Sequence, residues 1–240
     1  MISIEENLTQ LQQRIHTAAT AVGRDPKQIQ LIAVSKKHPL NAILEAQQYG
    51  QRDFAENYVQ EAVDKIQAVD KIQAVDNIQQ APGPALQWHF IGKLQSNKTK
   101  LIAEHFDWVH TIDRETVANK LSRYRPSHLD PLNCCIQVNI DDEAQKGGIN
   151  PDELASLINS IAPLAGIRLR GLMMIGQQSA AIDQRIASFK QLAAIWSPYQ
   201  GELPHWDTLS MGMSSDFELA IQHGATMVRV GEALFGARPQ

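Results

Sequence analysis

The stretch WDTLSMGMSSDFELAIQHGATMVRVGEALFG, residues 206–236, contains the same local pattern twice. A short apolar run at 206–211 leads into a loop of small residues, and a second run at 225–230 leads into another. Runs of this length and composition are typical of buried strands. Because each run is followed by a loop and a further segment of chain, the stretch predicts consecutive strand–loop–helix units and a parallel α/β fold.

The rest of the chain repeats this alternation of strand and helix signals. Helical stretches separate six further strand-like runs, which lie at 30–35, 50–55, 87–92, 107–112, 133–140 and 167–175. Eight such units predict a single (β/α)8 TIM-type barrel, and the length of 240 residues is near the roughly 250 typical of that fold. A doubly wound open sheet is the structural alternative.

Helix-start signals support the same reading. Apolar residues recur at spacings of three and four between Ile4 and Val22, which predicts an extra helix before the first strand. Ser3 and Glu6 form a capping-box pattern at its beginning. The run 150–153, Asn-Pro-Asp-Glu, predicts another helix start, with a cap, a proline at the first position and a glutamate at the third.

Composition excludes several classes of function. The 22 Lys and Arg residues against 26 Asp and Glu give a net charge of −4, which argues against a nucleic-acid binder. The sequence contains no run of about 18 apolar residues, so we expect no membrane-spanning helix. Its first residues do not form a signal-peptide pattern, and we therefore expect the protein in the cytoplasm. The two cysteines, Cys134 and Cys135, are neighbours on a predicted strand and point to opposite faces, so we expect no disulfide.

In a barrel, the chemistry lies in the loops that follow the strands. The seventh loop carries Ser210, Met213 and Ser214, and the eighth begins at Arg229 and Gly231. Loops seven and eight often bind a phosphate, helped by the N–H groups of the helix that follows. The alternative is that Gly231 and Gly236 are only turn residues.

Lys36 ends the first predicted strand. A lysine in a partly dry barrel mouth can have a lowered pKa, and its neutral amine can form a Schiff base with an aldehyde. Most lysines at strand ends instead extend the ammonium group into water. Because both faces of a barrel strand are apolar, periodicity does not distinguish Lys36 from Lys37.

Residues 62–79 contain a tandem repeat, AVDKIQ-AVDKIQ-AVDNIQ. Its apolar residues recur every third position, so on a helix each lags the previous one by about 60° and the stripe winds around the axis. We therefore expect a repeat-extended, exposed helix around 56–79 within one domain, 1–240. A protein-contact helix is the alternative.

Six segments, taken together, resemble one known family. They are AVSK at 33–36, AENYVQE at 55–61, WHFIGKLQSNK at 88–98, GLMMI at 171–175, LSMGMSSDFELAI at 209–221 and GATMVRVGEALFG at 224–236. Their identity and order are similar to those of the pyridoxal phosphate homeostasis proteins, which are related to the N-terminal barrel of alanine racemase. The resemblance covers nearly the whole chain. It departs from the usual family pattern at Ala55 and Lys93, where glycine and proline are more common.

The resemblance implies a barrel that holds pyridoxal 5′-phosphate as a Schiff base on Lys36. Ser214 and Gly231 match the phosphate-binding positions, with Ser210, Met213 and Arg229 nearby. The resemblance does not decide whether Arg229 contacts the phosphate or the ring nitrogen. Asn57 and His89 match positions that line the pocket, and no metal site is implied.

Three functions remain to be separated. The family implies a regulator of vitamin B6 homeostasis and of amino-acid and keto-acid balance, which delivers the cofactor to apo-enzymes. An amino-acid racemase would need a positioned base, and relatives that racemise supply a tyrosine from a second domain. Because the sequence ends at Gln240, about ten residues after Arg229, we expect a non-enzymatic protein. We also expect a monomer, since the sequence defines no large exposed apolar face. The third hypothesis is an interaction protein that uses the repeat helix.

Overall fold

Eight parallel strands form a closed barrel, in agreement with the fold predicted from the sequence. The computed structural model describes residues 3–75, 85–143, 147–177 and 179–237. Each strand pairs with the next in chain order, and the last pairs with the first, which excludes the open doubly wound sheet. The strands are β1 (Gln30–Val34), β2 (Asp53–Glu56), β3 (Gln87–Phe90), β4 (Trp108–Ile112), β5 (Leu132–Gln137), β6 (Ile167–Met173), β7 (Thr208–Met213) and β8 (Met227–Val230).

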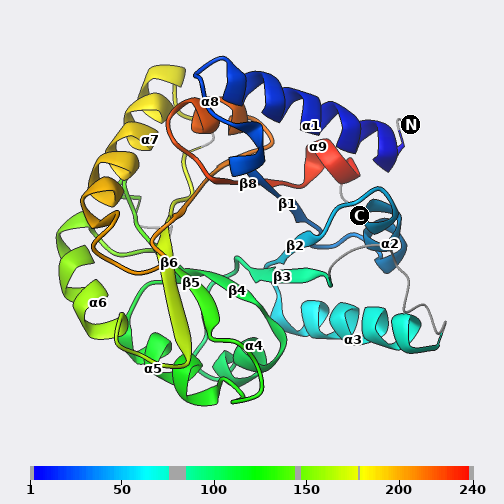
Figure 1. The fold of residues 1–240 in the computed structure, drawn as a ribbon, viewed down its shortest axis with the longest axis horizontal. Coiled ribbons are helices and arrows are strands. Elements are labelled where there is room, and N and C mark those ends of the chain that lie inside the picture. Colours follow the sequence, from blue (N-terminus) through cyan, green and yellow to red (C-terminus); the bar gives the residue numbers. More distant parts are fainter. Residues whose placement is uncertain (1–2, 76–84, 144–146, 178, 238–240) are drawn as a thin grey trace.

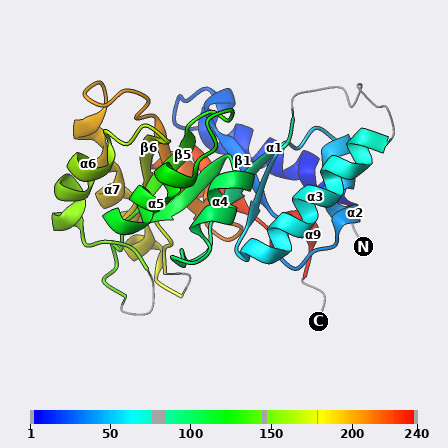
Figure 2. The ribbon, with the colours of Figure 1, turned by 90° about the horizontal axis from the view of Figure 1, so that it is seen from below.

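Helices surround this barrel (Figure 1). They are α1 (Ile4–Thr20), α2 (Leu40–Gln48), α3 (Val59–Val75), α4 (Thr99–His105), α5 (Glu115–Tyr124), α6 (Leu154–Ile161), α7 (Ile182–Trp196), α8 (Phe217–Gln222) and α9 (Glu232–Phe235). The predicted extra helix, α1, precedes the first strand and lies beside α8 and α9. The view turned by 90° shows α3 on the outside of the barrel (Figure 2).

The helix-start signals are confirmed by side-chain contacts. Ser3 Oγ accepts the N–H of Glu6 at 3.2 Å, and the Glu6 carboxylate accepts the N–H of Ser3 at 2.9 Å. Asn150 and Glu153 form a second capping box, but the turn it opens, Pro151–Glu153, is a 3₁₀-helix that leads into α6. Each capping box satisfies N–H groups that have no partner within the helix.

Alternation along the strands divides the apolar residues into two groups. The barrel interior holds Val34, Trp108, Cys135 and Met227 with their neighbours, whereas Cys134 packs in the larger core between strands and helices. The adjacent cysteines therefore lie on opposite faces of β5 and are both free thiols, as expected from strand geometry.

β2 begins three residues later than predicted. Gly50 has φ +93°, a left-handed conformation that ends the connection from α2 rather than starting a strand. The Gln51 side-chain amide donates to the carbonyls of Leu31 and Asp53 at 2.8 and 2.7 Å, so the residues before Asp53 are fixed by side-chain contacts.

The repeat segment is helical where it is described. Val63, Ile66 and Val69 of α3 are buried, whereas Ile72 is 37% exposed. The apolar stripe therefore leaves the barrel surface as it winds around the helix, as its period of three predicts. Residues 76–79 of the predicted helix lie outside the described residues. Within the described residues, no helix is long and apolar enough to cross a membrane.

Candidate functional site

A cavity of about 390 Å³ lies at the carboxyl ends of the strands, where a barrel of this kind holds its ligands. Its walls come from the loops after β1, β2, β3, β6, β7 and β8. The lining residues that the sequence singled out are Lys36, Asn57, Met213, Ser214, Arg229 and Gly231. We call this cavity the upper pocket.

The structure separates Lys36 from Lys37. Lys36 is half-buried and lines the upper pocket. Lys37 is exposed and does not line it, and its φ of +63° turns the chain away. The Lys37 backbone N–H donates to Glu61 Oε1 at 2.6 Å, which holds this unusual conformation in place. Of the two lysines, Lys36 is therefore the one that lines the upper pocket.

Arg229 supplies a buried positive charge to the same pocket. Its guanidinium donates through Nη1 to Ser210 Oγ and through Nη2 to the Met174 carbonyl, both at 2.7 Å. Burial lowers the pKa of Arg229 to about 10, and the negative charge of Asp216 opposes this shift. Arg229 therefore remains a cation at neutral pH. Both of these hydrogen bonds go to neutral oxygens.

The loops after β7 and β8 meet beside this charge. Ser214 Oγ accepts the N–H of Ala233 at 3.5 Å, so the two loops are in contact. Gly231 belongs to the loop after β8, and a Cβ at that position would come within 3.1 Å of the Val34 carbonyl oxygen. Glycine thus lets the β8 loop approach β1 closely at the pocket wall.

Asn57 forms another wall. Its Oδ1 atom is buried and has no hydrogen-bond partner among the described residues. The backbone of Asn57 is fixed by Gly92, since a Cβ on Gly92 would lie 2.0 Å from the Asn57 carbonyl oxygen. An unsatisfied buried acceptor in a pocket wall is a position where a ligand can donate or where water can bind.

Two sequence-predicted residues, His89 and Ser210, lie below the pocket instead of in its wall. Both are fully buried in the barrel interior. Ser210 Oγ accepts from Arg229, and His89 is separated from Ser210 by His110. Their connection to the pocket therefore runs through Arg229.

The pocket also contains residues that the sequence did not select. His38 is buried with its ring 5.1 Å from that of Phe235, and Ile91, Met173, Ile175 and Ser215 complete much of the lining. His38 and Ser215 follow strands and Met173 is the last residue of β6, and this position near a strand end is the one signal that points to them. His110 carries no such signal, because it lies within a predicted strand.

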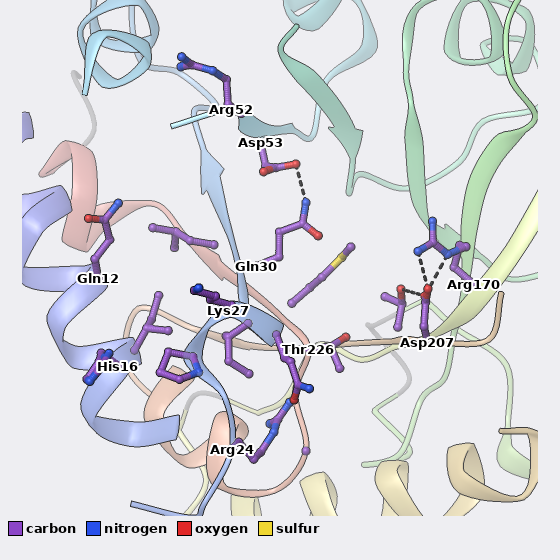
Figure 3. Close-up of a pocket in the computed structure, with 18 of the residues that line it drawn as sticks. Gln12, His16, Arg24, Lys27, Gln30, Arg52, Asp53, Arg170, Asp207 and Thr226 are labelled. Atoms are coloured by element: carbon purple, nitrogen blue, oxygen red, sulfur yellow. Dashed lines mark hydrogen bonds and ion pairs between the residues drawn. The ribbon is translucent and has the colours of Figure 1, made fainter. Parts of the chain in front are cut away.

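A larger cleft of about 1090 Å³ lies at the opposite, amino-terminal ends of the strands (Figure 3). Arg170 and Asp207 form an ion pair there at 2.6 Å, and Gln30 donates to Asp53 at 2.6 Å. In barrels this face serves stability, and the carboxyl face carries the chemistry. We therefore place the candidate site in the upper pocket.

The upper pocket combines an amine, a buried cation and small hydroxyl-bearing loops. This set suits an anionic ligand that carries an electrophilic carbonyl, because the amine can attack the carbonyl and the cation can stabilise the anion. In the described part of the chain, no group of three or more His, Cys, Asp or Glu residues is arranged to hold a metal ion.

Comparisons with known proteins agree on one family. The family model described as alanine racemase, N-terminal domain, matches residues 5–239. A pyridoxal phosphate homeostasis protein of Vibrio cholerae is 49% identical over 238 residues, which cover 99% of this chain and 98% of that protein. The protein of the same name from Escherichia coli K12 is also 49% identical, with the same coverage.

Solved structures give the same grouping. PipY of Synechococcus elongatus, in a structure described as having PLP bound, is 37% identical with a TM-score of 0.79, and the match covers 98% of this chain and all of that one. An alanine racemase of Clostridium difficile is 13% identical with a TM-score of 0.73. That match covers 99% of this chain but 57% of the racemase, and it shows a shared fold.

Proposed function

The chain belongs to the family of pyridoxal phosphate homeostasis proteins, and from this we propose that it binds pyridoxal 5′-phosphate in the upper pocket and serves vitamin B6 homeostasis. The observation that carries the proposal is the presence of Lys36 and Arg229 in one cavity of about 390 Å³. The first can bond the aldehyde of this ligand, and the second can neutralise part of its negative charge.

The residues present fit this group. Pyridoxal phosphate carries an aldehyde, a phosphate and a polar aromatic ring, and it can stabilise negative charge on a bound amino acid. We propose that the Lys36 amine condenses with the aldehyde to a Schiff base and releases one water molecule. Ser214 and Gly231 are proposed to bind the phosphate, with Met213 next to them and Ser210 acting from below through Arg229. The unpartnered Asn57 Oδ1 atom supports a polar contact on that wall.

The proposed role is that of a cofactor carrier. We propose that the protein holds and releases the cofactor for apo-enzymes that need it, and so influences amino-acid and keto-acid balance. The curated relatives carry the name of homeostasis proteins, not of racemases. Within the described chain, none of the four tyrosines lines the upper pocket, so a tyrosine base for racemisation is not available there.

Borohydride reduction tests the covalent bond. We expect the purified protein to show the absorbance band of a Schiff base, and sodium borohydride to fix one pyridoxyl group on the peptide that contains Lys36. Lys36→Ala should abolish both signals, whereas the matched variant Lys37→Ala should retain them. A label found on Lys37 alone, or no label, would falsify the proposal.

An activity assay tests the carrier role separately. We expect no sustained turnover of free L- or D-amino acids by the loaded protein. Turnover that is lost in Lys36→Ala would instead establish the second candidate function, a racemase-like enzyme. Transfer of labelled cofactor to an apo-enzyme, measured by recovery of that enzyme's activity, should accompany loss of the Schiff-base band.

A further inference from the structure

A chain of hydrogen bonds crosses the barrel interior from the amino-terminal cleft to the upper pocket. Asp53 Oδ1 lies 3.2 Å from His89 Nε2, and His89 Nδ1 lies 2.9 Å from His110 Nε2. His110 Nδ1 lies 2.9 Å from Ser210 Oγ, which accepts from Arg229 Nη1 at 2.7 Å. We call these five residues the interior chain.

The polarity of the interior chain follows from its two ends. Arg229 has only donors, so Ser210 Oγ must accept from it and its hydroxyl proton is left to donate to His110 Nδ1. His110 then carries its proton on Nε2 and donates to His89 Nδ1. His89 in turn carries its proton on Nε2 and donates to the Asp53 carboxylate, which can only accept.

The reverse polarity fails at two positions. If His110 Nδ1 donated to Ser210, the hydroxyl proton of this fully buried serine would have no acceptor among the hydrogen bonds of the described residues. His89 would then donate from Nδ1 to His110. It would therefore face Asp53 with a bare nitrogen or become a fully buried imidazolium, and both are costly.

Packing holds the two rings in these orientations. The His89 ring stacks on the Trp108 indole at 5.5 Å with an interplanar angle of 12°, and the His110 ring lies 5.7 Å from the same indole. His89 and His110 are both fully buried. A half-turn of either ring would put ring carbons where the hydrogen-bonded nitrogens lie, so the contacts to Asp53 and Ser210 fix the orientation of both rings.

We propose that His89 and His110 are positioning residues for pyridoxal phosphate, which act by orienting the Ser210 hydroxyl so that it fixes the Arg229 guanidinium in the floor of the upper pocket. Asp53 anchors the far end of the interior chain in the amino-terminal cleft (Figure 3). This inference rests on the proposed function, because Arg229 is the residue through which the interior chain meets the ligand.

Nitrogen-15 NMR of histidine-labelled protein tests the polarity without using activity. We expect both buried rings to be neutral, with a protonated Nε2 and a bare Nδ1. The signals of His110 are identified by their loss in His110→Asn, and the exposed His16 should show averaged tautomers. A protonated Nδ1 on His110, or an imidazolium at His89, would overturn the proposed chain.

Cofactor affinity tests the positioning role. His110→Phe fills the space but removes the acceptor for Ser210, so we expect the Kd for pyridoxal phosphate to rise about tenfold, as for a weakened hydrogen bond to a charged group. His110→Asn retains an acceptor near the Nδ1 position, and its Kd should stay within about threefold of wild type. If His110→Phe does not fold, His110→Leu, which also removes the acceptor for Ser210, takes its place in the same measurement.

A matched control comes from the same cleft. Asp207 lines the cleft like Asp53, but its carboxylate pairs with Arg170 and is outside the interior chain. Asp207→Asn should therefore leave the Kd unchanged within about twofold. If wild-type Lys36 is labelled by borohydride but His110→Phe binds normally, the positioning role alone is refuted. If the wild type shows no labelling, the proposed function fails, while the NMR polarity is still tested independently.

Discussion

At the scale of single residues, burial of His110 makes stability depend on pH. Burial lowers the pKa of His110 well below its ordinary 6.5, and the positive charge of Arg229 acts in the same direction. The unfolded chain therefore binds a proton near pH 6.5 that the folded chain does not bind. A depressed folded pKa gives stability that is complete above the unfolded value and is lost as the pH falls.

We expect His110 to reduce the free energy of unfolding by about 1.4 kcal/mol between pH 7.5 and 5.5. Urea unfolding at several pH values measures this. In His110→Phe that part of the decrease should disappear. The smaller contribution of His223, whose pKa is also lowered by burial, should remain in both proteins. An equal slope in the two proteins would show that His110 is protonated in the folded state.

The same scale shows where sequence reasoning on individual residues reaches its limit. Alternation correctly placed Arg229 on the face opposite Val228 and Val230, because strand geometry fixes sides. It could not separate Lys36 from Lys37, since that choice depends on the positive φ of Lys37 and its contact with Glu61. Local patterns do not encode a contact between residues 24 positions apart.

At the scale of elements, the repeat helix α3 is bonded to the barrel through a buried lysine. Lys65 lies in the first AVDKIQ copy, and its ammonium donates to Glu56 Oε1 and Glu61 Oε1 at 2.7 Å and to the Ser35 carbonyl at 2.9 Å. The helix is thereby tied to the backbone just before Lys36. Lys71, the equivalent residue of the second copy, is exposed, because six residues turn the helix through about 600°.

This difference between two identical repeats predicts different costs of mutation. Lys65→Met should lower the free energy of unfolding by about 3 kcal/mol, because it leaves the fully buried Glu56 without its cation. Lys71→Met should change it by less than about 0.5 kcal/mol. Chemical denaturation of both variants measures the difference. Equal effects would mean that the Lys65 pairing contributes no net stability.

The Lys65 variant also has an expected pH dependence. Burial raises the pKa of Glu56, and Lys65 and Ser35 oppose this shift. Removing Lys65 should raise that pKa further. A raised folded pKa gives stability that is present at low pH and lost as the pH rises. The deficit of Lys65→Met relative to wild type should therefore be smaller at pH 5 than at pH 7.5.

At the scale of the whole molecule, the barrel was predictable and its polar interior was not. Eight apolar runs, separated by helical segments and turn residues, predict the eight strands. Each strand is predictable because its pattern lies within a few consecutive residues. The interior chain joins residues that are 36, 21 and 100 positions apart, from Asp53 to Ser210. Only closure of the barrel brings them together, so His89 could be identified by resemblance and His110 by nothing in the sequence.

Closure also brings the amino-terminal helix against the last two strand–helix units, which carry Ser214 and Gly231. Arg24, just after α1, donates through Nη1 to the carbonyls of Ile221 and Ala225, both at 2.8 Å. Arg14 of α1 pairs with Glu218 at 2.6 Å and covers the Phe217 ring at 4.5 Å, but its side chain is 46% exposed. Both arginines connect the amino-terminal part of the chain to its carboxyl-terminal part. The contacts of Arg24 are partly buried, whereas Arg14 is largely exposed.

These environments predict unequal contributions to stability. Arg24→Met should lower the free energy of unfolding by about 2 kcal/mol, because two partly buried carbonyls lose a charged donor. Arg14→Met should cost about 1 kcal/mol or less, since solvent screens its ion pair. Raising the salt concentration should weaken the Arg14 contribution more than that of Arg24. Urea unfolding at low and high salt measures both. A larger loss at Arg14 would mean that the exposed pair, not the carbonyl contacts, joins α1 to the barrel.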